Sequence, residues 1–334
     1  MKNSKKDMTK KIIFLALCSL LLACCAVDAQ QAGKIFRIGF LDNTTASGSA
    51  VRLEAFWQEV RKLGWIEGKN ITIEYRFTEG KNSRLPELAA DLGRLKVDLI
   101  VVTGTIAALA AKRATTTIPI LFTSSTDPVA GGLVASLARP GGNVTGFSSL
   151  GTELHTKRLE VLKDAVPKLA RVGLLRSPGN IIPQDLQLKD LRAAAVALKL
   201  KLEEIETQPN AKSLESAFQT AKQKQVGAIM MLGPVLFAER KRIVELAGKY
   251  QLPAIYPQNE FVDEGGLMFY GPDYDDLFRR AAVYVDKILK GAKPGDLPVQ
   301  QATKFEFVIN LKAAKQIGLT IPVRVLERAN QVIK

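Results

Sequence analysis

Residues 35–41 read IFRIGFL, residues 42–49 read DNTTASGS and residues 51–63 read VRLEAFWQEVRKL. The first stretch is a short apolar run with the length and composition of a buried strand. The second is rich in turn-forming side chains, and the third places apolar residues at helical spacing on one face. A strand, a polar loop and an amphipathic helix in this order begin a βαβ unit, which predicts a mostly parallel sheet.

The same order of elements recurs along the rest of the chain. Further strands are expected at 71–75, 98–102, 118–122, 171–175, 200–205, 226–232, 253–256, 266–269 and 305–309. Helices are expected at 84–95, 153–165, 185–198, 211–224, 235–249 and 274–290. Two more are expected, an Ala-rich helix that ends at Arg113 and a helix from Leu311 onward. Residues 71–75 alternate apolar and polar side chains, so this strand is expected to lie toward an edge of its sheet.

The pattern is interrupted at residues 141–146, GGNVTG, and then restarts. A chain of 334 residues is long enough for about two domains. We therefore predict an α/β fold with two doubly wound parallel-sheet lobes joined by a hinge. The tail is too short for a third domain and is expected to return to both lobes. The predicted N-terminal lobe comprises 35–147 plus about 270–303, and the C-terminal lobe comprises 148–269 plus about 304–334.

Residues 1–29 have the character of a leader. Five lysines precede the apolar run Ile12–Ala23, which is typical of a secretory signal peptide. The run is shorter than the roughly 20 residues that a membrane-spanning helix needs. The sequence LLAC ending at Cys24 resembles a lipobox that would carry a lipid, whereas Val27–Ala29 offers a cleavage site before Gln30. Both routes stay open, and both predict an extracytoplasmic or periplasmic protein.

The composition excludes several classes of function. All three cysteines, Cys18, Cys24 and Cys25, lie in the leader, so the mature domain is predicted to have no disulfide and no cysteine nucleophile. The formal net charge of +14 becomes +11 when the five lysines and two aspartates of residues 1–29 are removed. Basic residues alternate with acidic ones along the predicted helices, which argues against nucleic acid binding. We expect a monomer.

Enzyme motifs are missing from the sequence. It contains no G-x-G-x-x-G, G-x-x-x-x-G-K-[ST], G-x-S-x-G or H-E-x-x-H pattern. His155 is the only histidine, and a surface or hinge position suits it better than a catalytic triad. The acidic clusters lack the spacing of a calcium-binding EF-hand loop. We predict no catalysis, no cofactor and no metal site.

The candidate site lies in the loops that follow the predicted strands. Ligands of open parallel sheets bind beyond the carboxyl ends of the strands. Several of these loops carry short polar side chains that can hold a small polar ligand, although the same residue types favour turns and helix N-caps. The loops are Asp42–Thr45, Thr103–Thr105, Ser124–Asp127, Ser177–Asn180 and Gln258–Glu260.

Several motifs in a fixed order resemble the bacterial ABC transporter substrate-binding proteins of the tryptophan/tyrosine-receptor-like branch, which have a type I periplasmic-binding fold. The motifs are LGWIEG (63–68), IEYR (73–76), TTTIPI (115–120), DPV (127–129), LARPGGNVTG (137–146), GGLM (265–268), YGP (270–272), KILKGAKP (287–294), LPV (297–299), NLK (310–312) and IP (321–322). The resemblance runs from about Ile35 to the C-terminus.

The resemblance implies a solute-binding protein of an ABC importer. Two lobes joined by a three-stranded hinge would close on a small molecule, with an aromatic or other amino acid as the leading ligand, and then dock on a membrane permease. The residues that would line the cleft are Asp42, Asn43, Thr44, Thr103, Gly104, Thr105, Ser124, Ser125, Asp127, Asn180, Gly233 and Asn259. The alternative function is a ligand-sensing receptor of the same fold that signals to a membrane partner.

Within this set, Asp127 is the favoured anchor for a ligand ammonium group, and the alternative is that it stabilises the turn before Pro128. Residues 232–237, LGPVLF, lack the polar side chain expected of a specific contact. The second lobe is therefore expected to recognise the ligand by its shape. The aromatic residues that could stack on a ring or belong to the core are Phe122, Phe147, Tyr256 and Phe261. Hinge candidates are 145–146, 270–271 and 301–303.

Overall fold

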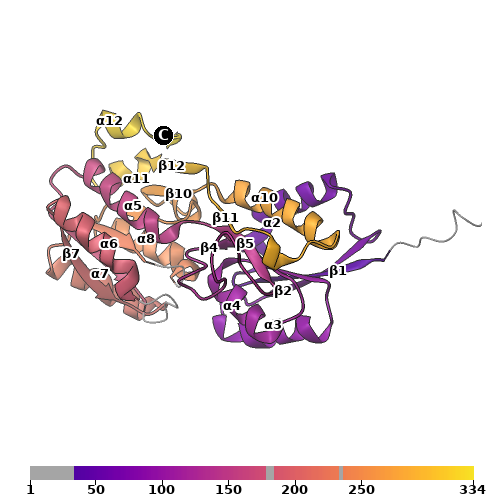
Figure 1. Ribbon diagram of the computed structural model, residues 1–334. Coiled ribbons are helices and arrows are strands. Elements are labelled where there is room, and N and C mark those ends of the chain that lie inside the picture. The colour runs from indigo at the N-terminus through magenta and orange to yellow at the C-terminus, as the bar shows by residue number, and fades with distance from the viewer. Residues whose placement is uncertain (1–33, 178–183, 233–235) are drawn as a thin grey trace, which may run out of the picture.

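The computed structural model describes residues 34–177, 184–232 and 236–334, and the structural statements below concern these residues. The predicted leader with Cys24, as well as Asn180 and Gly233, lies outside the described residues. The chain forms two lobes, each built on its own sheet with helices packed against both faces (Figure 1).

The first sheet is parallel and has the strand order β11-β5-β4-β3-β1-β2. Its strands are β1 (Phe36–Asp42), β2 (Ile71–Phe77), β3 (Leu99–Val102), β4 (Ile120–Ser125), β5 (Val144–Ser148) and β11 (Gln300–Gln301). Helices α2 (Ala46–Lys62) and α10 (Tyr274–Leu289) cover one face. The opposite face is covered by α3 (Leu85–Arg94), preceded by the short helix η1 (Asn82–Arg84), and by α4 (Gly104–Ala114).

The strand β1 shows why the sequence folds in this way. Ile38 and Phe40 point to the face of α2 and α10, whereas the next residue, Leu41, packs on the face of α3 and α4. A strand that is buried on both faces needs a nearly continuous apolar run. Helix α2 then begins after Thr45, whose side-chain oxygen accepts a hydrogen bond from the backbone N–H of Gly48.

The second sheet has the strand order β13-β12-β10-β9-β8-β6-β7. Its strands are β6 (Arg171–Arg176), β7 (Lys201–Glu206), β8 (Ala228–Met231), β9 (Ala254–Tyr256), β10 (Met268–Pro272), β12 (Phe305–Asn310) and β13 (Gln331–Ile333). One face carries α5 (Gly151–Ala165), α6 (Gln184–Ala197), α11 (Leu311–Gln316) and α12 (Val323–Leu326). The other carries α7 (Ala211–Gln223) and α8 (Arg240–Lys249), and α9 (Glu260–Asp263) packs beside them.

Three segments of the described chain cross between the lobes. They are Ser149–Leu150 between β5 and α5, Asp273 between β10 and α10, and Ala302–Lys304 between β11 and β12. Backbone hydrogen bonds join them, from Asp273 N to Lys304 O (3.0 Å) and from Ala302 N to Ser148 O (2.9 Å). The crossings are therefore fastened side by side and connect the two sheets as one hinge.

The predicted α/β class with two doubly wound lobes is confirmed, and β2 is an edge strand as expected. Several details differ. The hinge candidates 145–146 and 270–271 lie inside β5 and β10, and the chain crosses two to four residues later. Strand β10 belongs wholly to the second sheet, so we propose the lobe boundary after Pro272 instead of near residue 270.

Several elements were not predicted, and most of them are short: β5, α9, β11, α12 and β13. The helix expected at 235–249 is split into the short helix η2 (Phe237–Glu239) and α8. The expected C-terminal helix stops at Gln316, and the chain ends instead on α12 and the short strand β13, which pairs with β12. The turn segment before β11 contains the short helix η3 (Pro294–Asp296).

A buried cation ties α5 to the hinge side of the second sheet. Beyond Phe269, β10 no longer pairs with β9, and the carbonyl oxygen of Tyr270 accepts a hydrogen bond from Arg158 Nε at 2.7 Å. Arg158 is 2% exposed, and its Nη1 lies 3.3 Å from Nδ1 of His155, which is 3% exposed. Burial and the neighbouring Arg158 charge lower the pKa of His155 to about 3. His155 is thus a buried residue close to the hinge, which rules out a surface position.

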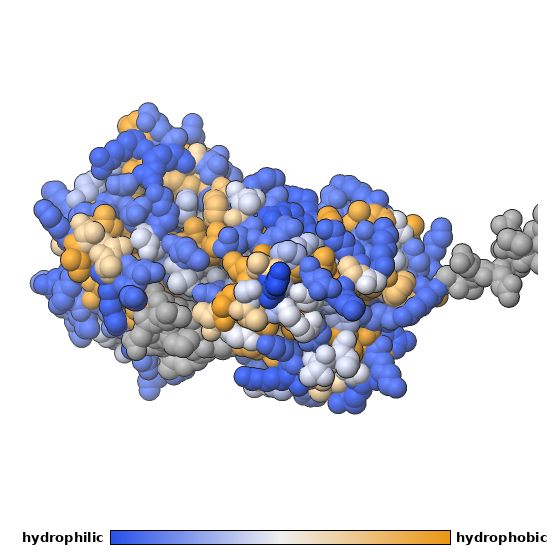
Figure 2. Space-filling view, in the orientation of Figure 1, coloured by the Kyte–Doolittle hydropathy of each residue, from blue (hydrophilic) through white to orange (hydrophobic). Residues whose placement is uncertain are grey.

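No helix in the described part of the chain is long and apolar enough to cross a membrane. On the face shown in Figure 2, hydrophobic residues are interspersed among hydrophilic ones over both lobes.

Gly146 is expected to be essential for the pairing of β5 with β4. A Cβ atom at this position would collide with the carbonyl oxygen of Phe122. Gly146→Ala should therefore lower the free energy of unfolding by about 1–3 kcal/mol in urea denaturation. Gly248→Ala is the matched control, because a Cβ there meets nothing within 4 Å and alanine favours the helix. Equal stability of the two variants would contradict the packing argument.

His155 should make the protein sensitive to acid. Because its pKa is depressed in the folded state, the unfolded chain takes up a proton as pH falls below about 6.5, and stability is lost. Between pH 7 and pH 5 this histidine should account for about 2 kcal/mol of lost stability. Urea denaturation at both pH values should show a smaller loss for His155→Gln. The same loss in both proteins would mean that His155 titrates normally.

Candidate ligand-binding site between the lobes

A small pocket of about 40 Å³ lies where the carboxyl ends of strands from both sheets face each other, and we call it the interlobe pocket. The first lobe contributes residues that follow β1 and β3, the beginning of α2, and one side chain of α10. The second lobe contributes the helix η2 after β8 and the loop after β9. The lining residues are Asp42, Asn43, Thr44, Gly48, Ser49, Arg52, Thr103, Phe237, Gln258 and Phe278.

Asp42 organises the first-lobe wall. Its carboxylate accepts hydrogen bonds from Thr44 N (2.9 Å), Thr44 Oγ1 (3.1 Å) and Ser49 Oγ (2.7 Å). The residue is only 2% exposed. A buried carboxylate with this set of donors is satisfied within the protein, so its role in the apo protein is to hold the β1–α2 loop in place.

Thr103 has the opposite character. It is the N-cap residue of α4, yet its side chain makes no capping hydrogen bond. Its Oγ1 is buried and has no hydrogen-bond partner among the described residues. An unpartnered hydroxyl beside the positive end of a helix is suited to meet a polar, anionic group of a ligand.

The second lobe presents an aromatic ring to this wall. Phe237 is partly buried and lies against Phe261, with ring centroids 6.0 Å apart and planes at 70°. The guanidinium of Arg240 lies 4.9 Å from the centre of the Phe237 ring. Phe237 also lines an adjoining pocket together with Asn43, Thr44 and Arg240. The lobe therefore offers a ring that is held by its neighbours and still reaches the pocket.

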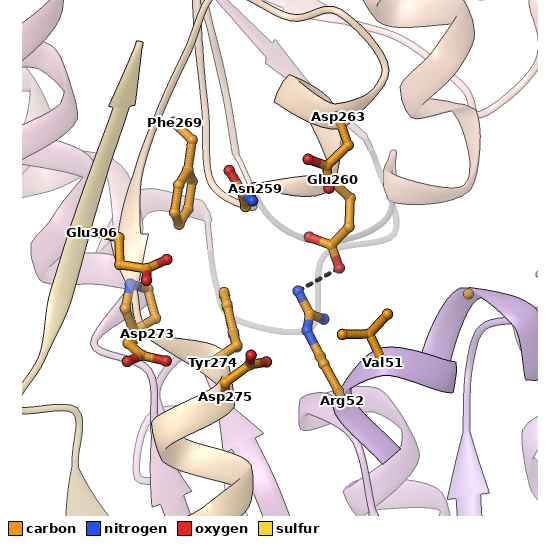
Figure 3. A pocket seen from close by; sticks show the side chains of 12 residues that line it. Val51, Arg52, Asn259, Glu260, Asp263, Phe269, Asp273, Tyr274, Asp275 and Glu306 are labelled. Carbon is orange, nitrogen blue, oxygen red and sulfur yellow. Dashed lines mark ion pairs between the residues drawn. The ribbon is translucent and has the colours of Figure 1, made fainter. Parts of the chain in front are cut away.

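Arg52 lines both the interlobe pocket and a second pocket of about 210 Å³, which we call the seam pocket and which Figure 3 shows. It pairs with Glu260 of α9, on the opposite lobe. Its guanidinium lies 4.6 Å from the centre of the Tyr274 ring at the start of α10. The seam pocket also contains Asn259, whose Oδ1 is buried without a partner among the described residues.

The structure brings together some of the predicted site residues. Asp42, Asn43, Thr44 and Thr103 line the interlobe pocket, and Asn259 lines the seam pocket. The remaining described ones, which are not among the lining residues of either pocket, are Gly104, Thr105, Ser124, Ser125 and Asp127. Asn180 and Gly233 lie outside the described residues.

Hydrogen bonds within the protein occupy several of those remaining side chains. Thr105 Oγ1 and Ser125 Oγ are 2.9 Å apart. Asp127 Oδ1 accepts from the backbone N–H groups of Val129 (3.1 Å) and Ala130 (2.9 Å), which is the turn-stabilising arrangement. Ligand contact by these residues stays a prediction.

Sequence reasoning missed Arg52, Phe237 and Phe278. From the sequence, an arginine in the second turn of a helix is expected to face solvent, and an aromatic residue after a buried strand is expected to lie in the core. The four aromatic residues considered at the outset, Phe122, Phe147, Tyr256 and Phe261, are at most 1% exposed and belong to the cores. The usable signal for Phe237 was its place in a loop that follows a strand.

No group of three or more His, Cys, Asp or Glu side chains in the described ranges could hold a metal ion. The pocket offers hydroxyls, amides, one arginine and aromatic rings, which can bind a small polar molecule with an apolar part.

Comparison with known proteins identifies relatives in sequence and in fold. A protein of Clostridioides difficile (strain R20291) named tyrosine-binding protein is 29% identical over 270 residues, which cover 80% of this chain and 76% of that protein. The ABC domain from Streptococcus pneumoniae, solved in complex with L-Trp, is 27% identical with a TM-score of 0.78, over 89% of this chain and all of that one. A conserved domain protein of Vibrio cholerae is 29% identical with a TM-score of 0.82, over 90% of this chain and all of that one.

The family model described as ABC transporter substrate binding protein matches residues 52–333, which include all three crossings, most of both lobes and half of the residues that line the interlobe pocket. This chain therefore belongs to the family of ABC transporter substrate binding proteins.

Proposed function

We propose that this protein is the extracytoplasmic receptor of an ABC importer that captures an aromatic amino acid between its lobes and delivers it to the permease. The observation that carries the proposal is the interlobe pocket, where Phe237 of one lobe faces a polar wall of the other. The tyrosine-binding relative and the structure with L-Trp support an aromatic amino acid as the ligand class. The function is binding, without catalysis.

The carboxylate of the ligand would bind at the beginning of α4. The free Oγ1 of Thr103 can donate a hydrogen bond there, and the N-terminal end of an 11-residue helix carries partial positive charge. Such a charge-assisted hydrogen bond is stronger than one between neutral groups.

The aromatic ring of the ligand would pack against Phe237. Aromatic pairs prefer offset-stacked or edge-to-face arrangements, and the neighbouring Phe261 and Arg240 hold the Phe237 ring in place. The amide oxygens of Asn43 and Gln258 are acceptors for the ligand ammonium group, since the Asp42 carboxylate is already satisfied.

Thr103 and Thr105 should behave differently when each is replaced by valine. Thr103→Val removes a free hydroxyl, so affinity for L-tryptophan or L-tyrosine should fall about tenfold while the melting temperature of the unliganded protein stays the same. Thr105→Val breaks the hydrogen bond to Ser125, so the melting temperature should fall and affinity should change little. Isothermal titration calorimetry and thermal denaturation provide the two readouts. The reverse pattern would place the ligand carboxylate at Thr105.

Phe237 should determine the preference for aromatic ligands. Phe237→Leu keeps an apolar side chain but removes the ring, so affinity for L-tryptophan should fall about tenfold while affinity for an aliphatic amino acid changes less. Phe36→Leu is the matched control, because Phe36 of β1 packs on Trp65 and is not among the pocket-lining residues. If L-tryptophan, L-tyrosine and L-phenylalanine all fail to bind the unmodified protein, the aromatic assignment is wrong.

A further inference from the structure

The two lobes are joined outside the hinge by an ion pair between Arg52 of α2 and Glu260 of α9 (Figure 3). The two side chains are 18% and 22% exposed. Ion pairs between fully exposed residues contribute little because water and salt screen them, and partial burial reduces that screening. This contact links elements that are more than 200 residues apart and belong to different lobes.

The first lobe holds the arginine in place before it meets its partner. The Arg52 guanidinium lies 4.6 Å from the centre of the Tyr274 ring, which is favourable for a cation–π interaction. Tyr274 is the first residue of α10 and follows the crossing residue Asp273 directly. A flexible side chain that is held on a ring loses less conformational freedom when it forms an ion pair.

The residues that line the seam pocket carry more negative than positive charge. The acidic residues that line the seam pocket are Glu260, Asp263, Asp273, Asp275 and Glu306, and Arg52 is the only basic one among its described lining residues. Asp263 and Glu306 show this crowding, because burial and neighbouring carboxylates raise the pKa of each.

These carboxylates belong to both sides of the seam. Asp275 lies on α10 of the first lobe, whereas Glu260 and Asp263 lie on α9 and Glu306 on β12 of the second. Without Arg52, closing the lobes would bring like charges together with no compensating cation in the lining of the pocket.

We propose that the Arg52–Glu260 pair is a latch that holds the unliganded lobes together, and that Arg52 is a positioning residue for ligand capture. The latch shifts the equilibrium between open and closed lobes. It thereby sets the fraction of receptor in which both walls of the interlobe pocket are already assembled, and apparent affinity scales with that fraction. Only this effect on affinity rests on the proposed function, because the latch itself needs no ligand.

The first test measures lobe separation without ligand. Spin labels at Lys81→Cys and Lys241→Cys place one probe on each lobe, on exposed side chains, in the full-length chain with its three leader cysteines replaced by serine. Double electron–electron resonance should show longer distances for Arg52→Gln and for Glu260→Gln than for the parent. The double variant should open no further than the single variants, since either change already breaks the pair.

The control is Arg61→Gln, which removes an equal charge from the same helix but breaks an ion pair with Glu54 that lies wholly within α2. Its distance distribution should match that of the parent. Unchanged distances in Arg52→Gln would overturn the latch whatever the ligand is, so this outcome differs from a failure of the aromatic assignment.

The second test separates a latch from a direct ligand contact, because Arg52 also lines the interlobe pocket. Binding of L-tryptophan measured by stopped-flow fluorescence should show about tenfold weaker affinity for Arg52→Gln. In a double-mutant cycle with Glu260→Gln, the two losses should be far from additive. Additive losses with unchanged lobe distances would assign Arg52 to ligand contact and overturn its role as a latch.

Discussion

The architecture depends on one constraint, which is that every crossing of the described chain between the lobes lies at the carboxyl edges of the two sheets. Strands β5, β10 and β11 all leave their sheets at that edge. The carboxyl ends of both sheets therefore have to face each other, and the loops that follow the strands form the walls of the pocket. The same constraint explains the antiparallel strand. The chain re-enters the second sheet at its carboxyl edge after β11, so β12 can only run against β10, pairing Phe305 with Pro272.

Most of the fold could be predicted from the sequence, because burial on both faces of a parallel sheet leaves a clear apolar run in each strand. Residues 36–42 and 99–102 are examples, and the alternating pattern of 71–77 identified an edge strand. The C-terminal end was harder. Residues 331–333 pair with β12 as a strand of only three residues, which is too short to leave a periodic signal. Its place in the sheet follows from tertiary contacts with β12.

The candidate site could be predicted only in part. The rule that ligands bind beyond strand ends found Asp42, Asn43, Thr44 and Thr103 in the first lobe. It also selected Thr105 and Asp127, whose polar atoms bond within the protein. Residue type alone cannot separate a free hydroxyl from a satisfied one, since that depends on neighbours brought in by folding. Arg52 and Phe237 were missed because they become pocket residues only when the two lobes meet.

The first lobe is built from segments that lie far apart in the sequence, and this has a consequence for folding during synthesis. Its core includes Leu277, Phe278 and Val285 of α10, and its sheet ends in β11. A chain that emerges from its N-terminus can form β1 to β5 early, but the sheet face that α2 and α10 share stays only partly covered until α10 arrives more than 120 residues after β5 began. The nascent chain should thus remain incompletely folded until it is nearly finished, and a chaperone would find an apolar sheet face accessible throughout that interval.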